Sequence, residues 1–212
     1  VPNGLLTLLR TLRKESISCM KHGLSWQAAV DAWRPYLPSL WASLSIPDRR
    51  RFFARLFTIW NVHRHRMAPS VGQVMADNLH SGRLRILAGY PKIAVESGRN
   101  SLTVGNKAGN GAEQLFPTQI FDCRGMGYDV TRLPSPLLKQ LLSARLLVPH
   151  QTGWGVEIDA DFRAKGTAQG SPLFVIGSLA IGDRLETTAV PELRGQAARI
   201  AALCLALRSD SL

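Results

Sequence analysis

Residues 172–207 read PLFVIGSLAIGDRLETTAVPELRGQAARIAALCLAL. The continuous apolar run over 173–176, ended by Gly177, is typical of a strand that is buried on both faces. The Ala- and Leu-rich stretch over 189–207 predicts the clearest helix of the chain, and residues 178–187 predict the loop that joins the two. A buried strand, a loop and a long helix in this order predict an α/β fold.

The start of this helix is a candidate ligand site. Thr188 is a suitable N-cap, and Pro191 then falls in the first turn, where its missing N–H costs no hydrogen bond. In open α/β sheets, ligands bind beyond the carboxyl ends of the strands, and a helix N-terminus attracts anions. The spacing also fits an ordinary strand-to-helix turn without a ligand, in which Glu186 and Glu192 are favourable charges near the helix start.

The rest of the chain is mainly helical before residue 80 and contains short strands after it. Apolar residues at helical spacing predict helices over 5–12, 26–33, 49–60, 69–79 and 134–147. Short apolar runs predict a small antiparallel meander and further strands over 84–88, 93–95, 101–104, 115–123 and 153–159. The glycine-rich stretch over 105–111 predicts a loop.

Composition limits the class of protein. The chain has 212 residues, of which 45% are hydrophobic and 19% are charged, so it can bury a core in one domain or two small ones. These values exclude a disordered chain, a collagen-like repeat and a disulfide scaffold. No apolar run approaches the ~18 residues of a membrane span. The net charge of +11 predicts attraction to anions such as nucleic acid, acidic lipid or phosphorylated cofactors.

The cysteines indicate a reducing compartment. Cys19, Cys123 and Cys204 lie far apart, their number is odd, and no Cys/His spacing suggests zinc, so we expect free thiols in the cytoplasm. Cys123 ends an expected strand and is predicted to be a buried, inert thiol. The first residues carry no secretory signal and no initiator Met, so we expect a chain that begins inside a longer protein.

The segment 49–66 is rich in arginine and aromatic residues. Its six arginines suit phosphate oxygens, and its Phe and Trp residues offer stacking faces to bases. The alternative interpretation is a solvated helix face at Arg49–Arg51 with the aromatic residues in the core. His63 and His65 are two residues apart and have no evident third partner, so we expect no metal site. The chain contains no GxSxG, HExxH or P-loop motif.

Three stretches resemble a family of bacterial FAD/NAD(P)-binding proteins, which are distant relatives of flavin-containing and N-hydroxylating monooxygenases. Residues 176–197 resemble the C-terminal part of that family. Residues 60–69, WNVHRHRMAP, resemble its W-(D/N)-x-H-R-H-R-x-A-P segment, and residues 121–125, FDCRG, resemble its (I/F)-N-C-T-G strand end. The first two stretches are fairly specific, and the third is weak by itself.

The resemblance implies a flavoprotein with two dinucleotide-binding domains, one for FAD and one for NAD(P)H, with both GxGxxG fingerprints upstream of this chain. Residues 1–82 would then be a helical insertion, residues 83–133 the closing strands of the NAD(P)-binding domain, and residues 134–212 the C-terminal part of the FAD-binding domain. The upstream half of the same protein would be the partner, beside a small-molecule substrate.

The resemblance also assigns residues to cofactor binding. Gly177 and Ser178 match the strand end beside the ribityl–pyrophosphate chain of the flavin, although many relatives have Asp where Ser178 stands. Residues 188–190 match the helix start that faces the pyrimidine side of the flavin. Arg124 stands where the family has a small Thr. The complete set implied for cofactor binding is Gly177, Ser178, Gly182, Thr188, Ala189, Val190, Arg124, Gly125, His63, Arg64, His65 and Arg66.

These observations predict the C-terminal portion of an FAD-dependent, NAD(P)H-using oxidoreductase of the monooxygenase or hydroxylase type. The flavin would carry out the hydride and oxygen chemistry, which agrees with the lack of a catalytic motif. Two alternatives stay open. One is a basic nucleic-acid-binding module built on residues 49–66, which the alternation of helices and strands disfavours. The other is an interaction protein that kept the fold and lost the cofactor.

Overall fold

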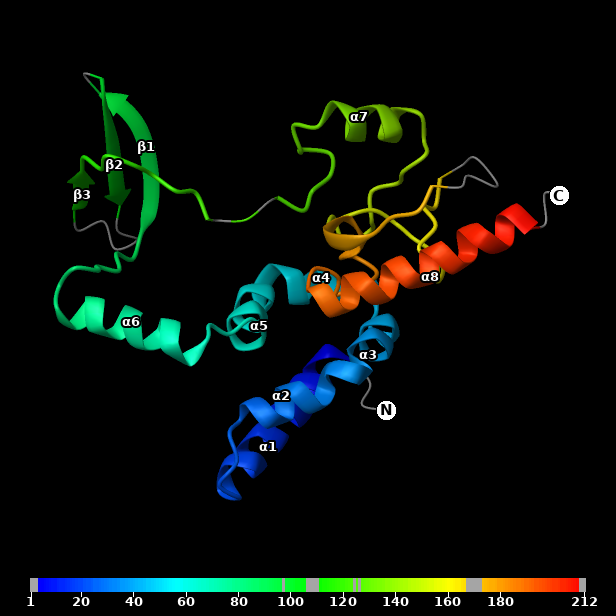
Figure 1. The fold of residues 1–212 in the computed structure, drawn as a ribbon, viewed down its shortest axis with the longest axis horizontal. Helices are drawn as coiled ribbons and strands as arrows, with labels where there is room; N and C mark the ends of the chain where they lie inside the picture. The colour runs from blue at the N-terminus through cyan, green and yellow to red at the C-terminus, as the bar shows by residue number, and fades with distance from the viewer. Residues whose placement is uncertain are drawn as a thin grey trace. The chain divides into compact units, whose positions relative to one another are not determined.

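The structure is a computed structural model that describes residues 4–96, 98–105, 111–123, 125, 127–166 and 173–209 (Figure 1). The chain forms two compact units: Val1–His65 together with Gly127–Leu212, and a second unit over 66–126. These limits differ from the expected parts 1–82, 83–133 and 134–212, because both ends of the chain belong to one unit. The assignment of those parts to cofactor domains stays a prediction.

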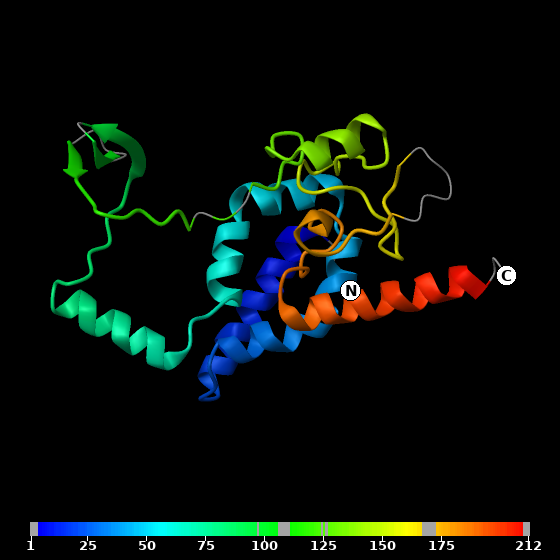
Figure 2. The same ribbon diagram turned by 45° about the horizontal axis from the view of Figure 1, so that its top comes forward.

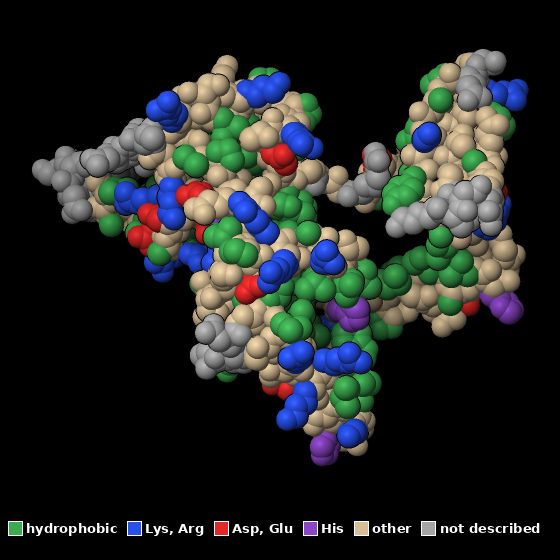
Figure 3. All heavy atoms as spheres, turned by 180° about the vertical axis from the view of Figure 1, so that it is seen from behind, with side chains coloured by type: hydrophobic (Ala, Val, Ile, Leu, Met, Phe, Trp, Pro, Cys, Tyr) green, Lys and Arg blue, Asp and Glu red, His purple; other side chains and the backbone are tan. Residues whose placement is uncertain are grey.

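The first unit begins with a series of short helices. They are α1 (Leu5–Lys21), α2 (Gln27–Trp33), η1 (Arg34–Tyr36), α3 (Leu37–Ser43), α4 (Ile46–Arg55) and α5 (Phe57–Arg64). Pro35, Pro38 and Pro47 each lie in a first turn, where a missing N–H breaks no hydrogen bond. The Ser45 hydroxyl caps α4 by accepting a hydrogen bond from the N–H of Asp48 at 3.3 Å. Figure 3 shows lysine and arginine side chains gathered over the lobe that α1 and α2 form.

The aromatic residues of α4 and α5 lie in the core, as the sequence predicts. Trp41, Phe52 and Phe53 meet edge to face, and Phe53 stacks on Trp154 with ring centroids 4.3 Å apart. Ile181, which is 2% exposed, joins the same cluster from the C-terminal part of the chain. The predicted helix over 49–60 is two helices, since the backbone kinks at φ −120° one residue after α4 ends. The C-terminal segment therefore completes the core of the N-terminal helices.

A second core cluster lies within the C-terminal part of the first unit. That part contains α7 (Pro136–Ser143), the 3₁₀ turn η2 (Gly177–Ala180) and α8 (Val190–Ser209). The buried members of the second cluster are Val130, Leu147, Val156, Ile158, Phe162, Val175 and Ala180. The segments that contain them are mostly extended loops, so apolar burial here does not depend on a sheet.

The strands predicted over 153–159 and 173–176 are absent from the described residues. Three isolated antiparallel bridges occur instead, at Pro149–Val156, Ile158–Ala164 and Arg163–Phe174. Ile176 is 43% exposed, so the run over 173–176 is not buried on both faces. A short apolar run shows that a segment packs on a core, and it does not show whether a ladder forms. The fold is therefore a mixture of helices and a small antiparallel sheet, without a parallel sheet in the described residues.

A buried group of polar contacts joins α3 and α4 to the loop after η2, and we call it the Gly182–Asp183 node. The Gly182 carbonyl accepts hydrogen bonds from Trp41 Nε1 at 3.0 Å and from Arg49 Nη1 at 3.3 Å. The Asp183 carboxylate lies 3.5 Å from Arg49 Nη1 and accepts the N–H of Ile158 at 3.0 Å. Arg49 is 8% exposed, so the predicted solvated face is wrong at this residue.

The second unit contains one helix, α6 (Pro69–His80), and a three-stranded antiparallel sheet. The strands are β1 (Tyr90–Glu96), β2 (Arg99–Gly105) and β3 (Ala112–Leu115), paired in chain order. The meander is thus confirmed for 93–95 and 101–104. Residues 84–88 form no strand, and the strand predicted over 115–123 is wrong, because β3 ends at Leu115, where that strand was expected to begin. Cys123 is exposed, not buried as predicted, and most of the loop over 105–111 lies outside the described residues.

Large apolar surfaces of both units are exposed. Among the described residues of the second unit only Ser101 is buried, and Ile93 and Val95 on one face of the sheet are 54% and 72% exposed. Over 190–207 of α8, the part whose side chains the structure describes, only Gln196 is buried, and Figures 1 and 2 show the C-terminal half of this helix extending away from the rest of its unit. None of the helices in the described part of the chain has the length and apolar character of a membrane span.

A methyl group at residue 182 has no room. A Cβ there would lie 2.3 Å from Cγ of His150 and 2.6 Å from the carbonyl oxygen of Trp154. We expect Gly182→Ala to lower the free energy of unfolding by about 2 kcal/mol, in the range of overpacked cores. Gly195→Ala, in α8 with no atom within 4 Å, is the control and should be neutral or stabilising by up to ~1 kcal/mol. Urea unfolding measures both, and equal effects would contradict the packing of Gly182.

The node makes stability depend on pH. Burial raises the pKa of Asp183, but hydrogen bonds from His150 and from the N–H of Ile158 outweigh burial, so the net pKa lies below its usual value. The stabilisation is therefore complete above the unfolded-state pKa of ~3.9 and is lost as the pH falls through the folded-state pKa. We expect Asp183→Asn to cost roughly 3 kcal/mol at neutral pH, because it leaves Arg49 buried without a counter-charge. Unfolding measured against pH should show this difference shrinking below about pH 4, and a constant difference would contradict the ion pair.

Candidate functional site

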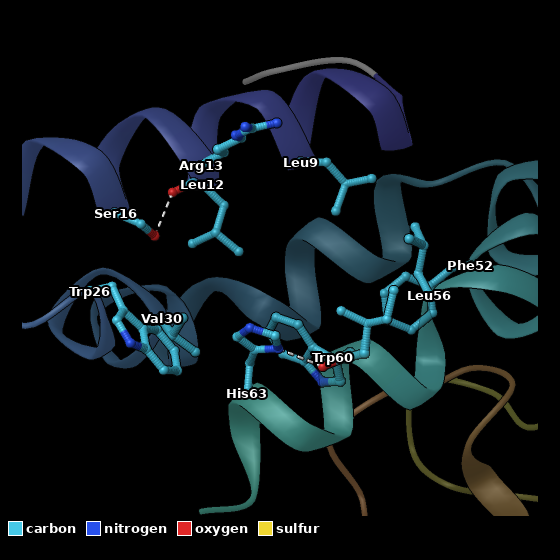
Figure 4. A pocket seen from close by; sticks show the side chains of 11 residues that line it. Leu9, Leu12, Arg13, Ser16, Trp26, Val30, Phe52, Leu56, Trp60 and His63 are labelled. Carbon is cyan, nitrogen blue, oxygen red and sulfur yellow. Dashed lines mark hydrogen bonds between the residues drawn. The ribbon is translucent and has the colours of Figure 1, made fainter. Parts of the chain in front are cut away.

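The His-Arg-His-Arg motif, residues 63–66, lies at the end of α5. Its four side chains have different surroundings. Figure 4 shows His63 beside Trp26 and Trp60, where its Nδ1–H donates to the carbonyl oxygen of Ile59 at 2.8 Å. Arg64 is buried, whereas His65 is exposed and ends the helix. Arg66 is exposed and belongs to the second unit. The motif therefore does not form one basic patch.

Arg64 belongs to an ion cluster with Arg34, Glu186 and Glu192. Arg64 Nη2 lies 3.4 Å from the Glu186 carboxylate and 3.9 Å from that of Glu192, and Arg34 lies 2.7 Å from Glu192. The indole N–H of Trp60 donates to Glu186 at 3.2 Å. Two cations face two carboxylates, so the cluster is neutral overall. It joins two stretches that lie far apart in the sequence, 60–69 and 176–197.

Burial and charge act in opposite directions on this cluster. Burial raises the pKa of Glu192, but the hydrogen bond and charge of Arg34, its own backbone N–H and the charge of Arg64 outweigh burial, so the net pKa lies below its usual value. Arg64 Nε and Nη2 and Glu192 Oε2 are buried without a hydrogen-bond partner among the described residues. Arg64 therefore attracts the two carboxylates mainly by its charge, in a poorly hydrated place where charges interact strongly, whereas Arg34 also donates two hydrogen bonds to Glu192.

A cavity of about 260 Å³ lies between the end of α5 and the start of α8. Trp60 and Tyr128 give it aromatic walls, and its polar groups come from Asn61, His65, Glu186 and Thr188. Of the residues predicted for cofactor binding, it contains His65 and Thr188. Tyr128 was missed, because no motif surrounds it in the sequence; its packing against Trp154, with ring centroids 4.5 Å apart, is visible only in the fold.

The loop before α8 is fixed by hydrogen bonds within the chain. Gly177, at φ +78°, donates its N–H to Gln196 Oε1 at 3.3 Å and accepts the hydroxyl of Thr187 at 2.9 Å. The first helical hydrogen bond of α8 runs from the N–H of Leu193 to the oxygen of Ala189 at 3.0 Å. Ala189 is therefore the N-cap, one residue after the expected Thr188. Thr188 is exposed and faces the cavity instead.

None of the other predicted site residues that the structure describes lines this cavity. Gly182 belongs to the Gly182–Asp183 node, where its carbonyl oxygen accepts the indole N–H of Trp41. The ring of His150 fills the space beside Gly182 that a cofactor in close contact would need. Ser178 lies within η2, and Val190 at the start of α8 is 68% exposed. Gly125 is exposed in the second unit, and Arg124 lies outside the described residues.

A further group of polar residues, formed by His150, Thr152 and Asp183, is structural. His150, Thr152 and Asp183 are arranged in a row, with Thr152 donating its N–H to His150 Nδ1 at 3.1 Å and His150 Nε2 3.3 Å from Asp183. His150 and Thr152 are at least nine-tenths buried, so substrate has no access to them. No group of three or more His, Cys, Asp or Glu side chains in the described residues is arranged to hold a metal ion.

Comparisons of the chain with models of known protein families, with curated proteins and with solved structures found no match.

Substitution of Arg64 tests how much the ion cluster contributes to stability. Arg64→Met leaves the buried carboxylate of Glu186 without its ion-pair partner, which we expect to lower the free energy of unfolding by about 3 kcal/mol. Arg34→Met is the matched control: this side chain is 39% exposed, and its loss should cost at most ~1 kcal/mol. Chemical denaturation of the two variants measures the difference. Equal losses would mean that Arg64 does not hold the site together.

Proposed function

We propose that the chain is the C-terminal portion of an FAD-dependent, NAD(P)H-using oxidoreductase of the monooxygenase or hydroxylase type. The observation that carries the proposal is the joining of two distant stretches at one cavity. Residues 60–69 and 176–197 resemble the same family in sequence, and Trp60, Arg64 and Glu186 hold them against each other. Both stretches line the cavity, so a ligand bound there would contact the parts of the chain on which the resemblance rests.

The residues of the cavity fit part of the cofactor. Small-molecule sites usually measure ~300–1,000 Å³, so a cavity of about 260 Å³ takes a ring system and not a whole dinucleotide. Aromatic walls at Trp60 and Tyr128 suit a planar ring, and Asn61 and Thr188 supply hydrogen-bonding groups. The described residues that line the cavity include no glycine-rich cradle for a pyrophosphate, which we assign to the upstream half of the protein.

The side chains of this chain would bind and orient the ring. Arg64 neutralises Glu186, so the carboxylate does not repel an electron-rich ring from the cavity. The N–H groups at the start of α8 favour negative charge nearby, and Thr188 lies at that end of the helix. A bound flavin supplies hydride acceptance and oxygen chemistry. No residue of the cavity needs to act as an acid or base in this proposal.

The exposed apolar surfaces support an upstream partner half. Soluble proteins rarely leave broad apolar faces in water, yet the sheet of the second unit and much of α8 are uncovered. An adjoining FAD/NAD(P)-binding half would cover such faces. The same faces also favour the second candidate function, an interaction protein that kept the fold without the cofactor, and the two differ in flavin binding.

The nucleic-acid alternative loses part of its basis. Arg49 and Arg64 are buried in ion pairs, and Arg50 donates to the carbonyl oxygen of Gln151 at 2.9 Å. Arg51 lies 3.4 Å from Asp48. Four of the six arginines in the segment 49–66 thus serve contacts within the chain, which leaves few of them for phosphates.

Flavin binding tests the proposal. We expect the chain, expressed together with the coding sequence upstream of it, to be purified with the two visible absorption bands of oxidised flavin and to bleach with NADH or NADPH. Thr188→Val removes one hydrogen bond of the cavity and should weaken FAD binding by about threefold to tenfold. Thr58→Val, on an exposed position of α5 outside the cavity, is the control. A colourless protein that does not take up added FAD would overturn the proposal.

A further inference from the structure

A second hollow lies on the opposite side of α5 from the cavity. It is an open groove of about 330 Å³ where α1, α2, α4 and α5 meet. Trp60 borders both hollows, while Ile59 and His63 face only the groove. Helical geometry accounts for this division, because residues 56, 59, 60 and 63 share one face of a helix and residues 57, 61 and 65 share another.

The groove has apolar walls. Figure 4 shows Leu9 and Leu12 pointing from α1 toward Trp60 and His63 of α5. Its floor is firmly packed, since Val30 and Phe52 are 4% and 5% exposed. Water against such walls is unfavourable, so an apolar chain that displaces it gains free energy in proportion to the area covered. Because the walls belong to packed helices, the groove is formed before any ligand arrives.

One arginine, Arg13, borders the groove. Arg13 lines it and also lines an adjoining shallow hollow on the outer face of α1, together with Arg10, Lys14 and Lys21. Arg13 and Lys14 follow Arg10 by three and four residues, and Lys21 follows Lys14 by two helical turns, so the four cations form a stripe on one face of the helix. The acidic residue of α1, Glu15, accepts the indole N–H of Trp33 and so faces α2. Arg13 therefore places a positive charge at the rim of the apolar interior, and the three other cations lie on the neighbouring outer face of α1.

We propose that this groove binds a long-chain carboxylate, with the alkyl chain along Leu9, Leu12 and Ile59 and the carboxylate at Arg13. An arginine fork suits a carboxylate, and neighbouring cations add attraction at longer range. His63 donates from Nδ1 to the backbone, which leaves Nε2 free to accept a hydrogen bond or, when protonated, to donate one. The site needs no flavin, so it stands apart from the proposed function.

Chain length tests the apolar part of the site. Isothermal titration of the full chain, without cofactor, with octanoate, decanoate and dodecanoate below micelle-forming concentrations should show tighter binding for longer chains. Each buried methylene is worth about a fourfold gain in affinity, by the usual ~0.8 kcal/mol per methylene. Equal affinity for the three acids would overturn the proposal, because the alkyl chain would then not lie in the groove.

Two variants with matched controls locate the site. Ile59→Asp places a carboxylate on the groove wall at a side chain that is 56% exposed, and should weaken dodecanoate binding by at least about tenfold. Val62→Asp, on the same helix and 67% exposed but outside the groove, should leave binding unchanged. Arg13→Glu should weaken binding by about fivefold, whereas Lys139→Glu, with the same change of net charge on α7, should not. Equal effects within either pair would overturn the proposal.

Other ligands distinguish the carboxylate from its competitors. Dodecyltrimethylammonium has the same alkyl chain with a positive head, and we expect it to bind at least about tenfold more weakly than dodecanoate. Vesicles of phosphatidylglycerol test a membrane surface, and an acidic amphipathic peptide tests a protein partner. Binding to vesicles or to the peptide, without binding of monomeric dodecanoate, would overturn the proposal in favour of that partner.

Discussion

The structure depends on one buried arginine. Arg49 lies within the first unit, and its guanidinium needs acceptors that cannot come from water. The oxygens of Ala42 and Leu44 supply two of them locally, and Gly182 and Asp183 supply the rest from more than one hundred residues away. This requirement fixes the loop after η2 against α3 and α4. Once that loop is fixed, Ile181 enters the aromatic core, and Glu186 lies within reach of Trp60 and Arg64.

The helix α5 borders two different hollows, one on each side. Its face toward the C-terminal loop combines aromatic rings with a neutral ion cluster, which suits a planar, electron-rich ring. Its face toward α1 is apolar and borders a positive rim, which suits an acidic alkyl chain. Trp60 lies between the two surfaces and gives its indole N–H to Glu186. The two proposals therefore concern separate ligands on one rigid element, and each can fail without the other.

Local patterns of the sequence are sufficient for the elements with clear periodicity. The helices α1, α6 and α8 and the meander of β1 and β2 lie where apolar spacing and turn residues place them. The strand predicted over 173–176 does not form, because these residues pack against loops and not against neighbouring strands. The kink at Leu56 could not be predicted, because no Pro or Gly lies near it in the sequence.

The candidate site was only partly within reach of the sequence. The stretches 60–69 and 176–197 could be found by pattern, and the pairing of Arg64 with Glu186 could not, since it depends on contacts across the whole fold. Gly182 illustrates the same limit: its sequence context fits a cofactor contact, whereas its surroundings in the fold are His150 and Trp154. The burial of Arg49 was missed because two neighbouring arginines make the segment look solvated.

Hydrogen exchange of the Trp41 indole N–H tests the central claim most directly. This group is buried and donates to the Gly182 carbonyl at 3.0 Å, so it should exchange only when the whole unit unfolds. The indole N–H of Trp33, which donates to the exposed carboxylate of Glu15, is an internal reference in the same spectrum and should exchange much faster. Exchange of Trp41 as fast as that of Trp33 would contradict the claim that the Gly182–Asp183 node holds the two ends of the chain together.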